Sequence, residues 1–210
     1  MDPLATEFAV FGYGSLLFEP IRPDLLVQQL PARLGGYCRA LNKRSRARGC
    51  ARAHSRWPET VVPSEFVEDG WTHSLAMGTQ PHPEAHIDGL LMIYPGPSEA
   101  LILELLDARE GFIAGREATL QGYLREEVTV DCCGQQRACV TYLSNSGGRM
   151  HYPSLSDEEG LAILRRATPL PNFRDHKHRG QEYVRQISAE LERLGCADPH
   201  LQRLVECFAE

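Results

Sequence analysis

The chain has 210 residues, of which 42% are hydrophobic and 24% are charged. This composition is normal for a globular protein of one domain and excludes a disordered chain. The longest uncharged apolar run, Phe8 to Phe18, is shorter than the roughly 20 residues that span a bilayer, and it follows acidic residues instead of the basic ones of a secretory signal. We therefore expect a cytoplasmic protein that does not bind membranes.

The formal net charge of −6 is unevenly distributed. Residues 1–58 contain nine Lys or Arg and four Asp or Glu, whereas the remainder contains 13 and 24. An acid-free interval from Leu25 to Pro58 holds eight of those nine basic residues. The pattern is typical either of one basic face on an acidic protein or of a nucleic-acid surface. Because only Tyr37 and Trp57 offer rings for base stacking there, we favour the basic face and expect no nucleic-acid partner.

The N-terminal half predicts strands separated by irregular segments. A strand rich in Phe and Val covers Glu7 to Tyr13 and ends at glycines. Pro23 is well placed in the first turn of a short helix that runs to about Leu30. The next expected segments are a strand over Leu34 to Leu41, an irregular stretch from Asn42 to about His73, and strands over Ser74 to Thr79 and His86 to Tyr94.

The C-terminal half predicts one hairpin and several helices. Pro97-Ser98-Glu99 opens a helix that ends near Gly111, and the hairpin joins Leu120 to Val130 with Gln136 to Leu143. The later segments are a helix from the capping box of Ser156 and Glu159 to about Ala167, a loop over Thr168 to Arg179, an amphipathic helix from Gln181 to Leu194, and a last helix capped by Asp198-Pro199. This order favours a single α+β domain over residues 1–210.

Cofactor chemistry has little support in the sequence. The seven cysteines include no CxxC pair, so we expect free thiols and no metal site. Two weaker alternatives are a metal site at His176 and His178 and a thiol nucleophile at Cys50 beside His54. Flanking histidines in a polar loop are usually solvated, and Cys50 lacks a group that would lower its pKa. We therefore predict neither metal nor other cofactor.

Two segments carry residues suited to chemistry. The first is Val10-Phe11-Gly12-Tyr13-Gly14-Ser15-Leu16, where a strand ends in Gly-x-Gly-Ser. Two residues without side chains let the backbone approach a ligand, and successive N–H groups can bind an anion, although a plain tight turn also fits. The second is Glu110, whose place at a helix C-terminus would raise its pKa as a general base requires. Position alone favours an ordinary surface glutamate beside Arg109.

In this order and separation, Phe11-Gly12-Tyr13-Gly14-Ser15-Leu16 and Leu106-Asp107-Ala108-Arg109-Glu110-Gly111 resemble motifs of the γ-glutamylcyclotransferase superfamily, which includes the ChaC-type, glutathione-specific members. The resemblance spans nearly the whole chain. The other segments that resemble the family are Gly36-Tyr37-Cys38-Arg39-Ala40, Tyr123 to Val130, Gln181-Glu182-Tyr183-Val184 and Leu194-Gly195-Cys196-Ala197-Asp198.

The resemblance implies a small, mixed β-barrel surrounded by helices. It also implies a reaction in which the α-amine of a γ-glutamyl compound attacks its own γ-amide carbonyl, which gives 5-oxoproline and a free amine or peptide. Glu110 would be the base that carries the proton. The substrate, a small γ-glutamyl molecule such as glutathione, would contact Val10, Phe11, Gly12, Tyr13, Gly14, Ser15, Leu16 and Tyr183.

Three alternatives stay open. ChaC-type members follow their Arg-Glu pair closely by Gly-Tyr, and here Gly122-Tyr123 lies nearer to Glu117 than to Glu110. We favour Glu110 because it ends the helix and matches Leu-Asp-x-x-Glu-Gly.

The second alternative is a non-catalytic module of this fold that binds a γ-glutamyl metabolite. The third alternative concerns the charge of the substrate's leaving portion. If its leaving portion is anionic, one or two arginines of the acid-free interval should contact it. The sequence indicates no oligomeric state.

Overall fold

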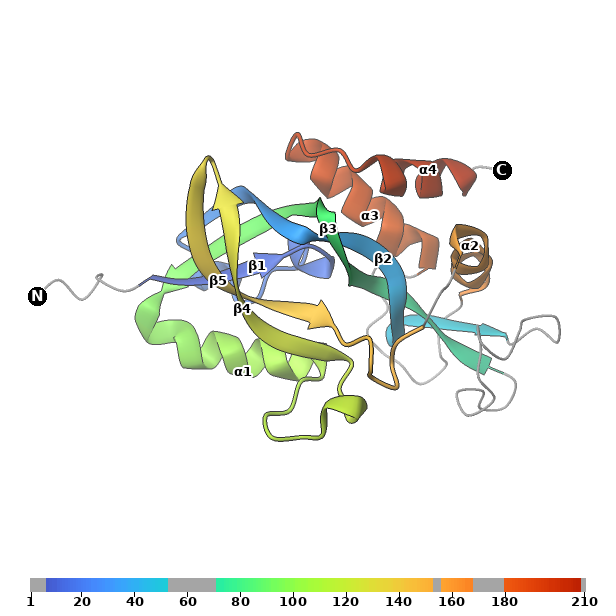
Figure 1. Cartoon of the computed structure of the whole chain (residues 1–210), viewed down its shortest axis with the longest axis horizontal. Coiled ribbons are helices and arrows are strands. Elements are labelled where there is room, and N and C mark those ends of the chain that lie inside the picture. The colour runs from blue at the N-terminus through green and yellow to red at the C-terminus, as the bar shows by residue number, and fades with distance from the viewer. Residues whose placement is uncertain (1–6, 53–70, 153–155, 168–179, 209–210) are drawn as a thin grey trace, which may run out of the picture.

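A computed structural model describes residues 7–52, 71–152, 156–167 and 180–208 of the chain (Figure 1). Five strands close a barrel in the order β1-β3-β2-β4-β5. Their bounds are Glu7–Gly12 (β1), Gln28–Arg52 (β2), Trp71–Pro95 (β3), Tyr123–Cys132 (β4) and Gln135–Ser144 (β5). The four α-helices of the described residues are Glu99–Glu110 (α1), Asp157–Arg166 (α2), Gly180–Arg193 (α3) and Pro199–Cys207 (α4). This arrangement confirms the expected α+β barrel surrounded by helices.

The barrel is mixed because β1 pairs differently with its two neighbours. It runs antiparallel to β3 along its whole length and meets β5 in parallel at Val10 and Val140. β2 and β4 pair antiparallel, with Arg33 opposite Asp131, and this pairing helps to close the barrel. The strand end at Gly12 therefore opens beside residues of β3 and β5, which positions the turn that follows it.

The long β2–β3 pair corrects three predictions. Asn42 to Arg52 and the residues from Trp71 onward are strand, where we expected an irregular stretch. The two strands expected around residues 81–85 are one strand, β3, because a register shift opposite Gly36 sets Pro83 between the paired residues Pro81 and His86. A proline at such a bulge removes no ladder hydrogen bond. The helix expected from Pro23 is only a 3₁₀ turn, Pro23–Leu25, before β2 begins.

The helices cover opposite sides of the barrel, with α1 on one side and α3 and α4 on the other (Figure 1). Ile102 and Leu106 of α1 pack in a smaller cluster with residues of β1 and β3. The larger core fills the barrel and continues under α2, α3 and α4 through Val184, Ile187 and Leu201. Both clusters border the end of β1, so the turn after β1 is held between two packed layers.

Several local predictions are confirmed. The hairpin turn at Cys133 and Gly134 has positive φ at both residues, as a tight two-residue loop between β4 and β5 requires. Ser156 and Glu159 form the expected capping box at the start of α2. The last helix, α4, is capped by Asp198, whose carboxylate accepts from two backbone N–H groups.

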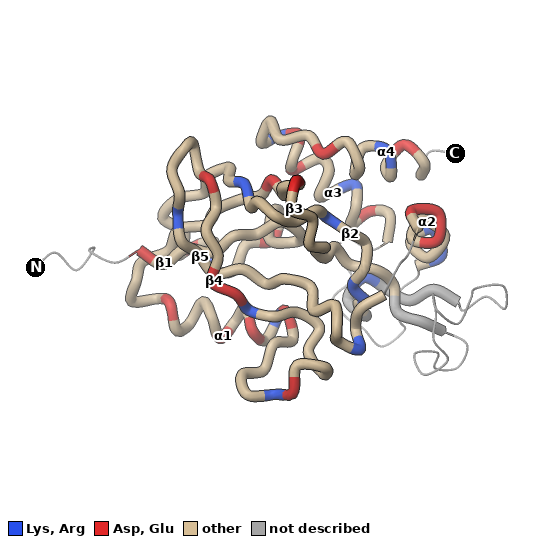
Figure 2. Tube along the Cα trace, viewed as in Figure 1, with Lys and Arg blue, Asp and Glu red and all other residues tan. Residues whose placement is uncertain are grey.

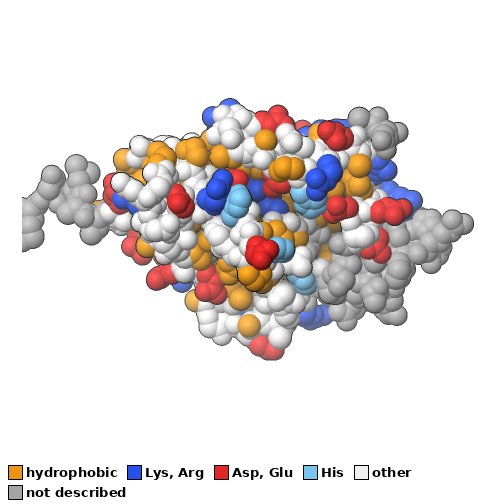
Figure 3. Space-filling view, turned by 45° about the horizontal axis from the view of Figure 1, so that its top comes forward, with side chains coloured by type: hydrophobic (Ala, Val, Ile, Leu, Met, Phe, Trp, Pro, Cys, Tyr) orange, Lys and Arg blue, Asp and Glu red, His pale blue; other side chains and the backbone are white. Residues whose placement is uncertain are grey.

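Charged residues are dispersed over the described surface. Figure 2 shows Lys and Arg recurring along β2, whereas α2 carries a group of acidic residues. On the face drawn in Figure 3, basic side chains stand apart from one another among acidic, histidine and uncharged ones. The described basic side chains thus make no continuous patch on that face. Lys43 and Arg48 of the acid-free interval line the pocket described next.

Candidate active site

A pocket of about 500 Å³ lies where the end of β1 meets the end of α1. Its lining comes from the turn after β1, from all the remaining strands and from α1 and α3. The lining residues are Phe11, Gly12, Tyr13, Gly14, Ser15, Leu16, Glu19, Pro20, Lys43, Ser45, Arg48, Ala76, Met77, Arg109, Glu110, Tyr123, Thr141, Tyr142 and Tyr183. It therefore brings together every substrate contact expected from the sequence except Val10, whose side chain is fully buried in the core.

The glycine turn, residues 12–16, is held tightly. A methyl group on Gly12 would lie 2.6 Å from Cβ of Leu16, and one on Gly14 would lie 3.3 Å from the hydroxyl of Tyr183. Packing inside the protein thus requires Gly12, whereas a side chain at Gly14 would displace Tyr183 slightly. Ser15 starts a single 3₁₀ turn, Ser15–Leu17, and its hydroxyl accepts from Nη2 of Arg109 at 2.8 Å. The N–H groups at the start of such a turn have no carbonyl of a preceding turn to bind, so they can meet an anion.

Glu110 is the last residue of α1, and Gly111, with φ of +72°, ends the helix behind it. Its side chain is 16% exposed, and its nearest described partner is Nε of Arg109 at 3.6 Å, an ion pair too long for a hydrogen bond. Burial raises the pKa of this carboxyl, while the positive charges of Arg109, Lys43 and Arg48 oppose the rise. The carboxylate thus lines the pocket with its oxygens available to accept a proton.

Asp107 binds the last turn of α1, the turn that carries Glu110, to the barrel, and the sequence reasoning missed it. One of its oxygens accepts from the hydroxyl of Tyr142 at 2.6 Å, and the other accepts from Arg125 at 2.7 Å. These bonds tie the last turn of α1 to β5 and β4. The signal was present in the Asp-x-x-Glu spacing, which places the two carboxylates one helical turn apart.

Glu117 does not lie with this group. It precedes the short 3₁₀ turn Ala118–Leu120, is exposed, and accepts from the hydroxyl of Thr119. It is not among the residues that line the pocket. Of the two glutamates that the sequence left as candidates, the structure brings only Glu110 to the glycine turn.

Three buried tyrosines shape the pocket from different elements. The hydroxyl of Tyr183, on α3, accepts from the backbone N–H of Met77 at 3.1 Å, and that of Tyr123 donates to the carbonyl of Met77 at 2.7 Å. The hydroxyl of Tyr13 donates to the carbonyl of Tyr142 at 2.6 Å. Burial raises the pKa of all three hydroxyls, so they remain protonated donors. Sequence reasoning had singled out Tyr13 and Tyr183, and it missed Tyr123 and Tyr142.

Tyr183→Phe should lower both stability and activity. The change leaves the buried N–H of Met77 without its acceptor, which costs about 1–3 kcal/mol of unfolding free energy. The hydroxyl also lies beside Gly14 in the pocket wall, so a lost substrate bond of about 1 kcal/mol should lower kcat/KM about fivefold. Urea unfolding and steady-state kinetics measure the two effects. A variant that loses stability and keeps its kinetics would restrict the hydroxyl to a structural role.

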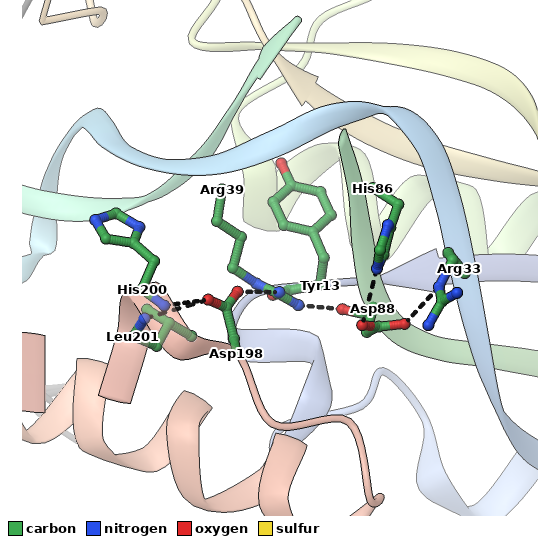
Figure 4. A network of polar contacts seen from close by, with 8 residues as sticks. All are labelled: Tyr13, Arg33, Arg39, His86, Asp88, Asp198, His200 and Leu201. Atoms are coloured by element: carbon green, nitrogen blue, oxygen red, sulfur yellow. Dashed lines mark hydrogen bonds and ion pairs between the residues drawn. The ribbon is translucent and has the colours of Figure 1, made fainter. Parts of the chain in front are cut away.

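Arg39 lies between Tyr13 of the glycine turn, Asp88 and Asp198, as Figure 4 shows. Its side chain is 3% exposed, and Nη1 donates to Asp198 at 2.8 Å. Nε donates to the carbonyl of Tyr13 at 3.3 Å, and Nη2 donates to the carbonyl of Asp88. One guanidinium thus joins the glycine turn to β3 and to Asp198, the N-cap residue of α4. This explains structurally why the strand Gly36 to Ala40 carries an arginine.

The remaining sequence predictions concern metals and thiols. No cluster of three or more His, Cys, Asp or Glu residues that suits a metal occurs among the described residues. His54, His176 and His178 lie outside those residues, as does the side chain of Cys50. The other six cysteines are free thiols. In the described part of the chain, no helix combines the length and the apolar character that crossing a membrane requires.

Comparisons with known proteins identify the fold. No family model and no curated protein matches the sequence. Two crystal structures of a yeast γ-glutamyl cyclotransferase specific to glutathione match it at 15% identity each. One of them, labelled with selenomethionine, has a TM-score of 0.69 over 96% of this chain and 95% of its own. The other has a TM-score of 0.65 over 96% and 97%.

A further solved structure, a γ-glutamyl cyclotransferase, has 16% identity and a TM-score of 0.51 over 95% of this chain and 86% of its own. At these identities a structural likeness speaks for the fold alone, because one fold can host several functions. The chain therefore has the γ-glutamylcyclotransferase-like fold.

Proposed function

We propose that this protein is a γ-glutamylcyclotransferase. The substrate is glutathione or another γ-glutamyl peptide or amine. Its α-nitrogen forms a bond to the γ-carbonyl carbon, and the bond from that carbon to the amide nitrogen breaks. The products are 5-oxoproline and the free peptide or amine. Because the nucleophile belongs to the substrate, the protein has to fold the glutamyl chain, move protons and stabilise the oxyanion.

Glu110 carries the proton in this proposal. It takes a proton from the substrate ammonium, which makes the nitrogen nucleophilic, and it returns a proton to the departing nitrogen. A raised pKa suits both steps, since the carboxyl has to hold the proton between them. The N–H groups of the glycine turn, residues 12–16, receive the α-carboxylate, and donors in the pocket wall stabilise the tetrahedral oxyanion.

The observation that carries the proposal is the environment of Glu110. It is a mostly buried carboxylate, without a hydrogen-bond partner among the described residues, in a pocket that also exposes a glycine-rich turn. Burial of a carboxylate without hydrogen bonds destabilises the folded state. Groups of this kind are concentrated at binding and catalytic sites. Asp107, on the same turn of α1, makes two short hydrogen bonds to other elements, so the position of the helix end that carries Glu110 is built into the fold.

The test is product formation from a panel of γ-glutamyl compounds. The purified protein is incubated with glutathione, γ-glutamyl amino acids and γ-glutamyl amines, and 5-oxoproline is measured by chromatography. At least one member should be converted in a time- and enzyme-dependent manner. The proposal fails if none yields 5-oxoproline above the rate of spontaneous cyclisation.

The pH dependence of kcat/KM should report Glu110. Activity requires its ionised form, so kcat/KM rises with pH through the pKa of Glu110, which burial raises from the ordinary value of a glutamate. The positive charge of Lys43 lowers this pKa, so Lys43→Met should move the acidic limb to higher pH. The measurement uses a γ-glutamyl substrate whose leaving portion is uncharged. If the acidic limb of the Lys43→Met profile stays at the same pH as that of the wild type, the pKa of Glu110 does not determine it.

A further inference from the structure

Lys43 presents a positive charge in the pocket that no described residue meets at hydrogen-bond distance, although the carboxylate of Glu110 acts on it from farther away. It lies on β2, is 8% exposed, and lines the pocket. Its Nζ lies 4.1 Å from the centre of the Tyr123 ring, and a methyl group on Gly122 would come within 2.6 Å of its Cε. The ammonium is therefore held between a ring and a backbone segment. Among the described residues, no hydrogen bond or ion pair reaches it.

Such a group is suited to bind an anionic ligand. An ammonium has three N–H donors, and a buried charge without acceptors is destabilising unless a ligand supplies them. Burial lowers the pKa of Lys43 to about 8, so the group remains largely charged at neutral pH. Arg109, by contrast, already donates to Ser15 and to Glu19. Arg48 adds a second positive charge from β2 to the lining.

The charges of a γ-glutamyl group do not match Lys43. Its α-ammonium belongs opposite Glu110, and its α-carboxylate belongs at the N–H groups of the glycine turn. The two charges of the γ-glutamyl group are therefore bound by α1 and by the turn after β1, and neither requires β2. A further anion has to come from the leaving portion, which lies beyond the amide bond.

We infer that Lys43 binds a carboxylate on the leaving portion of the substrate and selects γ-glutamyl peptides with a free C-terminal carboxylate over γ-glutamyl amines and peptide amides. The inference rests on the proposed function and deepens it. It also refines the expectation that arginines of the acid-free interval would bind this carboxylate. The basic residues of that interval that line the pocket are Lys43 and Arg48.

The experiment compares glutathione with its C-terminal amide, which differ only in the charge far from the reacting atoms. Wild-type kcat/KM should favour the acid about 10- to 100-fold, as a charge-assisted hydrogen bond of about 1.5–3 kcal/mol predicts. Lys43→Met should bring this ratio close to one, and Lys43→Arg should retain most of it. Any effect of Lys43 on Glu110 is common to both substrates and cancels in the ratio.

Arg137→Met is the matched control. It removes one positive charge from a residue that pairs with Glu7 outside the pocket, so it tests for a general effect of net charge. Its ratio should equal that of the wild type. A wild type without preference, or a Lys43→Met variant that keeps the preference, would overturn the inference.

Binding of an unreactive analogue separates this inference from the proposed function. Glutaryl-cysteinylglycine lacks the amine that attacks, so neither it nor its C-terminal amide can cyclise. Calorimetry should show tighter binding of the acid to the wild type and equal binding of both to Lys43→Met. If the wild type makes no 5-oxoproline, the proposed function fails, and the analogue pair alone then decides for or against the carboxylate site at Lys43.

Discussion

Glu110→Gln should abolish 5-oxoproline formation while the fold stays intact. The amide occupies the same volume but cannot take the proton from the substrate ammonium or return one to the leaving nitrogen. The loss of a general base usually lowers the rate by about 10²–10⁴-fold, and here one residue performs both transfers. Stability should not fall, because the substitution removes a carboxylate whose burial raises its pKa. Single-turnover assays and urea unfolding measure the two quantities.

Glu117→Gln is the matched control for this variant. It makes the same chemical change seven residues along the chain, at an exposed side chain outside the pocket. Its activity should equal that of the wild type. The reverse outcome, an inactive Glu117→Gln and an active Glu110→Gln, would move the base to the residue that the shorter Glu-to-Tyr spacing favours.

Local signals in the sequence were enough to predict the elements next to the site. The Phe- and Val-rich strand before the glycines, the helix that ends at Gly111 and the hairpin at Cys133-Gly134 all appear where expected. Each depends on interactions within a few residues, such as a cap, a positive φ or an alternating pattern. The pairing of the glycine turn with Glu110 came from the resemblance to a known family, and the structure places both in one pocket.

The parts that sequence reasoning missed depend on contacts between distant segments. The strand over Asn42 to Arg52 is rich in Arg and has little hydrophobic alternation, and its strand structure depends on pairing with β3. Tyr142 is an ordinary strand residue in the sequence and becomes part of the site because Asp107, 35 residues earlier, accepts its hydroxyl. Lys43 looked like one of many basic residues until the fold buried it beside Tyr123.

Arg39→Met should be the most destabilising substitution of this set. It removes the partner of Asp198 and leaves the carbonyls of Tyr13 and Asp88 without a donor that the native state provides. Breaking a buried ion pair from one side costs about 3–5 kcal/mol, because the remaining charge stays desolvated. The glycine turn also loses its attachment to α4, so kcat/KM should fall even where the protein remains folded. Urea unfolding and the 5-oxoproline assay measure both effects.

Two further variants show whether this cost arises from the buried network. Arg33→Met removes an arginine of the same strand whose side chain is 55% exposed and pairs with Asp88 at 3.0 Å, so its cost should stay below about 1 kcal/mol. Adding Asp198→Asn to Arg39→Met removes the unpaired carboxylate and keeps an α4 N-cap residue, so the double variant should be more stable than additivity predicts. Equal losses of unfolding free energy for Arg39→Met and Arg33→Met would show that the buried hydrogen bonds of Arg39 do not stabilise the glycine turn. Additive losses in the double variant would show that Asp198 and Arg39 stabilise the fold independently.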